Sequence, residues 1–133
     1  MIHNHNKTSR RKRAERRGRR GEIIAAIWLM LRGYRICQMR YRNRAGEIDI
    51  IARRGKWLVF VEVKTRAKGA SAFDVSRSQA DRMIRAANLY LAKLPLSAHM
   101  ETRFDLVLLG NWRWPQHIKG AFFDDSWGGR SIT

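Results

Sequence analysis

Cysteine is almost absent from this chain of 133 residues, which contains only Cys37. A single cysteine excludes an internal disulfide and any zinc site built from cysteine ligands. Cys37 is expected to pack as a small apolar side chain, in a protein of a reducing compartment such as the cytoplasm.

Long hydrophobic runs are also missing. The longest apolar stretch is Ile23 to Leu31, which has nine residues and is too short to cross a bilayer. It follows an overlong basic segment and lacks the small-residue cleavage site of a signal peptide. The stretch therefore predicts a buried helix from about Arg16 to Arg32, ended by Gly33, and no membrane partner.

Acidic residues are scarce, with 11 against 28 basic residues and a net charge of +17. Such an excess favours a polyanionic partner, and nucleic acid over a membrane. Nine basic residues and one acidic residue lie within residues 1–20. We expect a disordered basic arm over residues 1–15, a single folded domain over 16–125 and a loose tail over 126–133. The arm is either a phosphate-binding segment or a solvated tail.

Two segments in the middle of the chain predict a β-hairpin. Residues 46–52 and 57–64 are rich in β-branched and aromatic side chains, and Gly55 lies between them. A two-residue turn at Arg54-Gly55 would pair Asp49 with Phe60. A turn of odd length would place every side chain of one strand on the opposite face.

The charges of this hairpin are unusual because they interrupt apolar strands. With the even turn, Asp49, Glu62 and Lys64 converge on one face, and Glu47 lies opposite Glu62. Burying a carboxylate costs several kcal/mol unless it is paired or binds a metal. Two carboxylates and a lysine on one sheet face suit a hard divalent cation and a reacting phosphate.

Three short motifs together resemble those of a known family. Gly46-Glu47-Ile48-Asp49, then Val61-Glu62-Val63-Lys64-Thr65-Arg66, then Arg103-Phe104-Asp105 resemble the uncharacterised bacterial YraN family, a distant relative of archaeal Holliday junction resolvases. The likeness covers residues 20–123. It implies an α/β, restriction-endonuclease-like single domain, with a central mixed β-sheet of four or five strands flanked by helices.

The resemblance also implies a function. The expected activity is a divalent-metal-dependent endonuclease acting on DNA, including branched or junction DNA, with Mg²⁺ as cofactor and Mn²⁺ as its substitute. Asp49, Glu62 and the backbone carbonyl of Val63 would be metal ligands, and Lys64 would assist the attacking water. Glu22 would join them from the first helix. Its alternative role is a favourable charge near the start of that helix.

Several polar residues near the hairpin are candidates for binding nucleic acid. Arg42 and Arg44 are expected in a loop over residues 42–46, and Arg66 and Lys68 in a loop over residues 65–74. Gln79 and Arg82 are expected on a helix from Ser76 to Lys93. Gln79 departs from the lysine that is usual in the YraN family, and it has two readings: a capping box with Ser76, or a site residue.

The remaining strands are predicted at residues 34–41, 103–109 and 116–123. Asp105 lies inside the second of these, where we expect a structural acid bonded to a neighbouring strand rather than a catalytic group.

Two further functions stay open beside the enzyme. One is a non-catalytic nucleic-acid-binding module on the same fold, and the other is a scaffold that joins a ribonucleoprotein through the basic arm. All three predict affinity that falls steeply with salt. Only the enzyme requires Asp49, Glu62 and Lys64 together. The sequence leaves a homodimer open.

Overall fold

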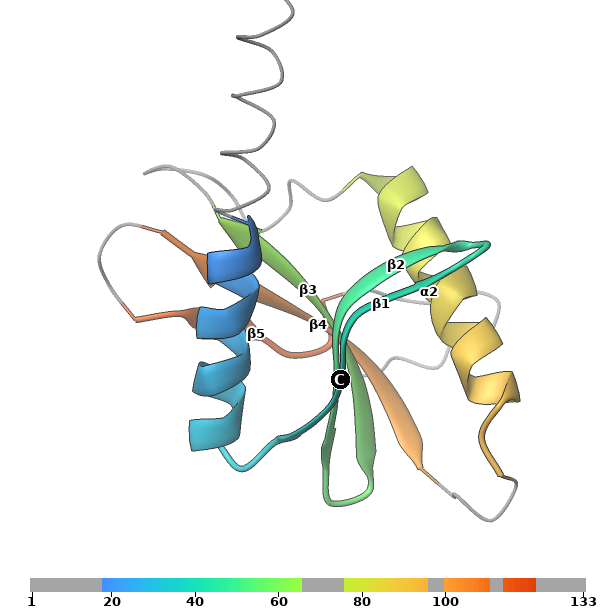
Figure 1. Cartoon of the computed structure of the whole chain (residues 1–133), viewed down its shortest axis with the longest axis horizontal. Helices are drawn as coiled ribbons and strands as arrows, with labels where there is room; N and C mark the ends of the chain where they lie inside the picture. The colour runs from blue at the N-terminus through green and yellow to red at the C-terminus, as the bar shows by residue number, and fades with distance from the viewer. Residues whose placement is uncertain (1–17, 66–75, 96–99, 111–113, 122–133) are drawn as a thin grey trace, which may run out of the picture.

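The computed structural model describes residues 18–65, 76–95, 100–110 and 114–121. They form an α/β structure in which a mixed sheet of five strands lies between two helices (Figure 1). The predicted arm and C-terminal tail lie outside the described residues, as do Arg66 and Lys68. No described helix is long and apolar enough to cross a membrane.

The strands are adjacent in the sheet in the order in which they occur in the chain. Strands β1, β2 and β3 form an antiparallel meander, β3 and β4 are parallel, and β4 and β5 are antiparallel. The parallel pair requires a crossover connection, which contains helix α2, Arg77–Ala92. The strand bounds are β1 Arg35–Asn43, β2 Gly46–Arg54, β3 Trp57–Thr65, β4 Glu101–Leu109 and β5 Gln116–Ile118.

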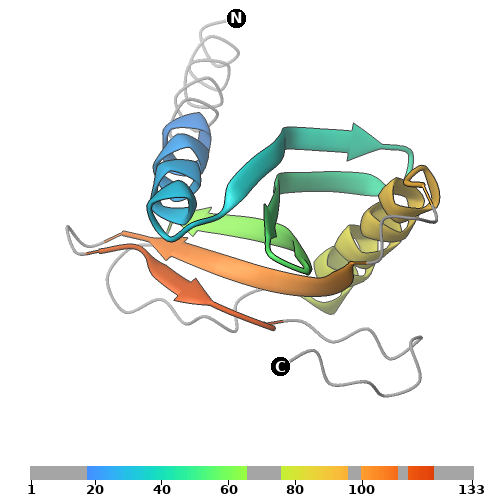
Figure 2. The ribbon, with the colours of Figure 1, turned by 90° about the horizontal axis from the view of Figure 1, so that it is seen from below.

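The N-terminal helix, residues 18–31 of the described chain, covers one face of the sheet (Figure 2). Gly33 has φ of +90° and ends the helix, as predicted. Its amide donates to the Met30 carbonyl and the Tyr34 amide donates to the Leu29 carbonyl. These two bonds form a Schellman cap, which satisfies carbonyls that would otherwise lack partners.

The prediction of a buried N-terminal helix is only half right. Ala25, Ala26 and Leu29 pack against the sheet, because small residues let the helix lie close to it. A helix on a sheet face buries one side only. The opposite side exposes large apolar residues: Ile23, Ile24, Ile27, Met30 and Leu31.

Helix α2 covers the other face of the sheet. Ser76 caps its start and Lys93 its end, as the sequence predicts. Met83, Ile84 and Ala87 form its buried stripe and pack with Phe60 and Phe104 of the central strands. The two helices thus sandwich β2, β3 and β4, whose side chains are buried on both faces.

The hairpin of β2 and β3 has the predicted two-residue turn, one residue further along the chain. The turn is Gly55-Lys56, and Arg54 pairs with Trp57. Gly55 has φ of +57°, the conformation needed at the first position of such a turn. The predicted pairing of Asp49 with Phe60 is therefore wrong, because Ile51 pairs with Phe60. The even length preserves which side chains share a face.

Strand β1 differs from its prediction at two places. It continues to Asn43, whose side-chain oxygen accepts from the Ala45 amide at 2.9 Å, so the predicted loop over 42–46 shrinks to a tight turn. Cys37 is exposed, which contradicts the expected burial. The pairing of β1 with β2 shifts register between Ile36 and Gln38, and this bulge lies on an edge strand.

The β1–β2 ribbon also bends where Arg40 faces Asp49. Ile50 packs on the side of the N-terminal helix, whereas Ile48 packs on the side of α2. These two residues would share a face in a regular strand, so the alternation breaks at Asp49. Beyond the bend the ribbon reaches α2, where the Asn43 amide group donates to the Ala86 carbonyl at 3.0 Å (Figure 1).

Candidate functional site

Two carboxylates from neighbouring strands meet beside the bend. Ile50 pairs with Val61, so Asp49 and Glu62 are the next residues on β2 and β3. Asp49 Oδ2 accepts a hydrogen bond from the Val63 amide at 2.8 Å. That bond fixes the Asp49 side chain across the strand and directs it to the segment that carries Glu62 and Lys64.

The surroundings of Asp49 disfavour its charged form. Burial raises the pKa of Asp49 and the neighbouring carboxylate of Glu62 raises it further, to about 8, from an ordinary value of 3.8. The Val63 amide opposes this shift, because it stabilises the carboxylate. The pair therefore holds a proton at neutral pH, which a cation bound by the two carboxylates would displace.

Glu62 is buried, with 7% of the residue exposed. Its Oε1 lies 3.2 Å from Lys64 Nζ and accepts from Gln79 Nε2 at 2.9 Å. The backbone amide of Gln79 donates to Ser76 Oγ at 3.1 Å. Only the Ser76 half of the predicted capping box is therefore present, because the Gln79 side chain contacts Glu62 and not the Ser76 amide.

Glu22 lies on the buried side of the N-terminal helix, as its spacing predicts, and is 8% exposed. A Cβ on Gly21 would come within 2.8 Å of Thr65 Oγ1, so this helix touches the end of β3. Glu22 does not contact Glu62 or Lys64. Its Oε2 instead accepts from Arg40 Nε at 2.5 Å.

A pocket of about 190 Å³ opens between the bent ribbon and α2. Glu47 lines it together with Glu62 but is not opposite Glu62 as predicted, because the register of β2 and β3 puts Asp49 level with Glu62. Arg42 Nη2 donates to Glu47 Oε2 at 3.1 Å. The pocket is lined by Gly46, Glu47, Glu62, Gln79, Arg82 and Met83.

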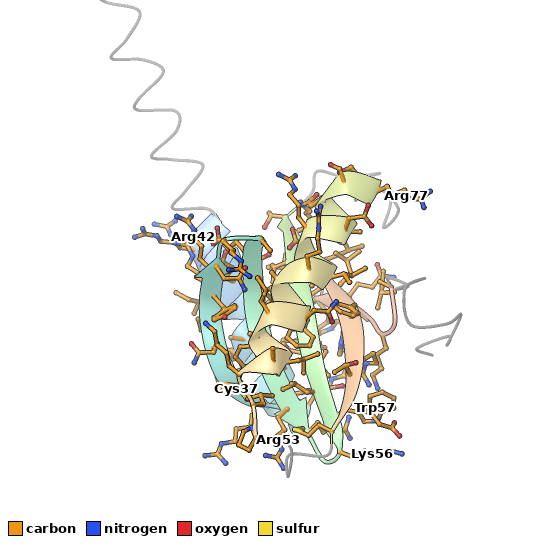
Figure 3. The ribbon with its side chains drawn as sticks, turned by 90° about the vertical axis from the view of Figure 1, so that its right-hand side faces the viewer. Cys37, Arg42, Arg53, Lys56, Trp57 and Arg77 are labelled. Carbon is orange, nitrogen blue, oxygen red and sulfur yellow. The ribbon has the colours of Figure 1, made fainter. Side chains whose placement is uncertain are left out.

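Basic side chains surround this acidic pocket. Arg82 lines it from α2, and the exposed Arg42 and Arg44 lie at the end of the β1–β2 ribbon. Figure 3 shows Arg42 and Arg77 at the same end of the molecule, with Arg53 and Lys56 at the other. The structure thus brings together four of the predicted nucleic-acid contacts around the predicted carboxylates: Arg42, Arg44, Gln79 and Arg82.

The donor atoms of the site suit an oxygen-preferring divalent cation. Asp49 and Glu62 supply carboxylates from adjacent strands, and the Val63 carbonyl lies between Glu62 and Lys64 in the chain. Within the described residues, no three His, Cys, Asp or Glu side chains are grouped closely enough to hold a metal ion. The third carboxylate, Glu22, is engaged by Arg40.

Arg40 is the site residue that sequence reasoning missed. It faces Asp49, since Met39 pairs with Ile50 and Tyr41 with Ile48. The bulge at Cys37 shifts the register between β1 and β2, and nothing in the sequence marks that shift. An arginine inside a predicted strand was the only available signal.

A second buried acid lies away from this site. Asp105 of β4 accepts from Arg103 Nε and Nη2, both at 2.8 Å, and from the Gly120 amide at 3.0 Å. His117 Nε2 of β5 lies 2.6 Å from its Oδ2. Arg103 also donates to the Tyr34 hydroxyl at 2.6 Å. These contacts confirm the structural role expected of Asp105.

The comparisons with known proteins place the chain in a family. The model of a family described as "Uncharacterised protein family UPF0102" matches residues 21–109 of this chain. The chain belongs to the UPF0102 family. That UPF0102 match spans every described residue of the carboxylate site, from Glu22 to Arg82.

Relatives in the family correspond to nearly the whole chain. A UPF0102 protein of Maricaulis maris is 47% identical over 116 residues, which are 86% of this chain and 91% of the relative. One from Mesorhizobium japonicum is 46% identical over 114 residues, or 85% and 91%. A third, from Rhizobium johnstonii, is 48% identical over 116 residues, or 86% and 95%. Their names give the family and no activity, so function is argued from the site.

Proposed function

We propose that this UPF0102 protein is a Mg²⁺-dependent endonuclease that cuts DNA, on a restriction-endonuclease-like fold. The observation that carries the proposal is the pair of Asp49 and Glu62 on adjacent strands, with Lys64 Nζ 3.2 Å from Glu62. Asp49 is half-buried beside Glu62, and its pKa is raised to about 8. The two carboxylates therefore disfavour a second negative charge, and a divalent cation would supply the compensating charge.

Asp49, Glu62 and the Val63 carbonyl would hold the cation, and Mn²⁺ would substitute because it takes the same oxygen ligands. When bound, the ion would lower the pKa of a water molecule and stabilise negative charge on the scissile phosphate. Glu62 is already oriented for this by Gln79 and Lys64. The Val63 amide orients Asp49 in the same way.

Lys64 provides the positive charge nearest the reacting phosphate. Its Nζ contacts Glu62 and its side chain is 23% exposed, so it remains accessible to a substrate. There it would position the attacking water or stabilise the charge that develops on the phosphate. Arg42, Arg44 and Arg82 would bind flanking phosphates, and the same role is proposed for Arg66 and Lys68.

The net charge of +17 supports a nucleic-acid substrate. The resemblance to junction resolvases makes branched DNA the first structure to compare with linear DNA. A substrate panel should therefore contain linear duplex, single-stranded, flapped and four-way DNA, each incubated with Mg²⁺ or Mn²⁺.

One observation favours the alternative, a nucleic-acid-binding module without catalysis. Lys64 already neutralises Glu62, as a purely structural ion pair would. Such a module needs the basic rim of the pocket, formed by Arg42, Arg44 and Arg82, but it does not need the carboxylates. Cleavage and binding must therefore be measured on the same variants.

The test uses Asp49→Asn, Glu62→Gln and Lys64→Ala, with gel-shift and cleavage assays on one substrate. The two carboxylate variants remove a ligand charge at nearly constant volume. Cleavage should fall by at least about 100-fold in each, the scale of losing one electrostatic group from a preorganised site. DNA affinity should hold or rise in the carboxylate variants, because each removes negative charge that faces a phosphate.

Glu101→Gln is the matched control. Glu101 is an exposed carboxylate on the same sheet that pairs with Lys56 at the opposite end, 3.6 Å away. It should cut and bind like the wild type, with folding checked by circular dichroism. A wild type that binds DNA but cuts no substrate would establish the binding module. Cleavage that survives Glu62→Gln would show that the site is wrong.

A further inference from the structure

Arg40 occupies a central position among the acids of the site. It faces Asp49 across the β1–β2 pair and donates from Nε to Glu22 Oε2 at 2.5 Å. The hydrogen bond with Glu22, and then the charges of Glu22, Glu47 and Asp49, raise the pKa of Arg40 above its ordinary value. Arg40 is therefore a cation that Glu22 holds directly, with Glu47 and Asp49 near enough to add to its stabilisation.

The backbone of Arg40 is also unusual. Its φ is +51°, a left-handed conformation that side chains with a Cβ adopt rarely. Among the described residues it is the one non-glycine residue with positive φ. Such a conformation persists only where the surrounding contacts hold it, and such residues cluster at functional sites.

The Arg40–Glu22 contact explains why the described acids do not form a three-carboxylate group. Asp49 and Glu62 are adjacent, whereas Glu22 is held by Arg40 on the other side of Asp49. The side chain of Arg40 is 36% exposed, so solvent is available to it if it leaves Glu22. A divalent cation beside Asp49 would repel Arg40 and attract Glu22.

We propose that Arg40 is a resident counter-cation that holds Glu22 until a divalent cation binds at Asp49 and Glu62, and then releases Glu22 to that cation. Arg40 is thus a positioning residue that sets the metal affinity of the site. In the absence of metal it neutralises acids that would otherwise repel a phosphate backbone. This inference rests on the proposed metal-dependent function.

The test is a titration of Mn²⁺ alone, followed by calorimetry, into the full chain and five variants. Arg40→Gln should tighten Mn²⁺ binding by about threefold to tenfold, the scale of one coupled pair. Glu22→Gln should weaken it. The double variant should bind like Glu22→Gln, because the effect of Arg40 acts through Glu22.

Two further variants separate charge from backbone and from distance. Arg40→Gly removes the charge and favours positive φ, so it should tighten binding as Arg40→Gln does. Arg35→Gln removes the same charge from an exposed side chain at the start of the same strand. It should change Mn²⁺ affinity by less than about twofold, because solvent and salt screen exposed charges.

The outcomes distinguish this inference from the proposed function. If the wild type binds no Mn²⁺, the metal-dependent function and the inference both fail. If Mn²⁺ binding depends on Asp49 and Glu62, the function stands, and the inference fails where Arg40→Gln and Arg40→Gly both leave affinity unchanged or weaken it. Equal tightening with and without Glu22 would also overturn it, since Arg40 would then act directly on the metal.

Discussion

Asp49 and Asp105 are aspartates of the same sheet with opposite surroundings. Asp105 is fully buried and meets Arg103, His117 and the Gly120 amide. Asp49 has one amide donor and a carboxylate neighbour. Burial alone would raise the pKa of both, yet hydrogen bonds from His117, Arg103 and Gly120 hold the pKa of Asp105 below its ordinary value.

The difference shows that burial does not identify a functional carboxylate. The partners of the carboxylate do, because a structural acid is surrounded by donors and a ligand acid by further acceptors. The location of Asp105 supports this distinction, since its network joins β4 to β5 and to Tyr34 at the end of the N-terminal helix cap.

The strongest way to test this contrast is to replace each acid by its amide. Asp105→Asn leaves Arg103 buried without its charge partner, and should lower the free energy of unfolding by about 3–5 kcal/mol. Asp49→Asn removes a repelled carboxylate and should raise stability in chelator at pH 8. Urea unfolding of both variants and the wild type provides the measurement. Equal losses in the two variants would mean that Asp49 is also a structural acid.

The pH dependence of stability should have opposite signs for the two acids. The folded-state pKa of Asp49 is raised to about 8 from 3.8, so its stabilising contribution is full below about pH 4 and is lost as pH rises toward 8. The folded-state pKa of Asp105 is lowered, so its contribution is present above 3.8 and is lost as pH falls below that value.

Melting temperatures in chelator across this range would separate the two contributions. Asp49→Asn should flatten the decline between about pH 4 and pH 8, and Asp105→Asn should flatten the decline below about pH 4. Saturating Mg²⁺ should remove the first decline in the wild type, whereas Asp49→Asn should lack that decline with or without Mg²⁺. An unchanged profile in Asp49→Asn would contradict the raised pKa.

The smallest expected effect concerns the basic rim. Arg82 lines the pocket, and its Nε donates to the Ser78 carbonyl at 3.4 Å. Arg82→Gln should weaken DNA binding and reduce the slope of log affinity against log salt by about 0.9, the value of one lost phosphate contact. Lys93→Gln, exposed at the far end of α2, is the control. An unchanged slope in Arg82→Gln would remove it from the interface.

Much of this architecture follows from the sequence. Two segments rich in β-branched and aromatic residues predict the central hairpin, and Ser76 and Gly33 mark helix ends that the structure confirms. The pairing of Asp49 with its neighbour in β3 was missed by two residues because Gly55 fits either position of a two-residue turn. Sequence spacing fixes the parity of a hairpin more firmly than its register.

The features that the sequence does not predict depend on contacts between residues that are distant in the chain. Arg40 and Glu22 are separated by 18 residues, and Arg103 and Tyr34 by 69. The first pair needs the bulge at Cys37, and the second needs the helix cap to deliver Tyr34 to β4. Neither local propensity nor periodicity encodes such distances. The predicted nuclease chemistry stays a prediction, because the fold alone does not specify it.

The irregular backbone of β1 affects whether copies of this protein can associate through the edge of the sheet. β1 is an edge strand, and a regular edge offers unpaired amides and carbonyls on which another chain can add a strand. The register shift at Cys37 and the left-handed Arg40 interrupt that row, and Arg35 and Arg42 add exposed positive charge along it. The same distortions that shape the carboxylate site thus make this edge a poor template for aggregation.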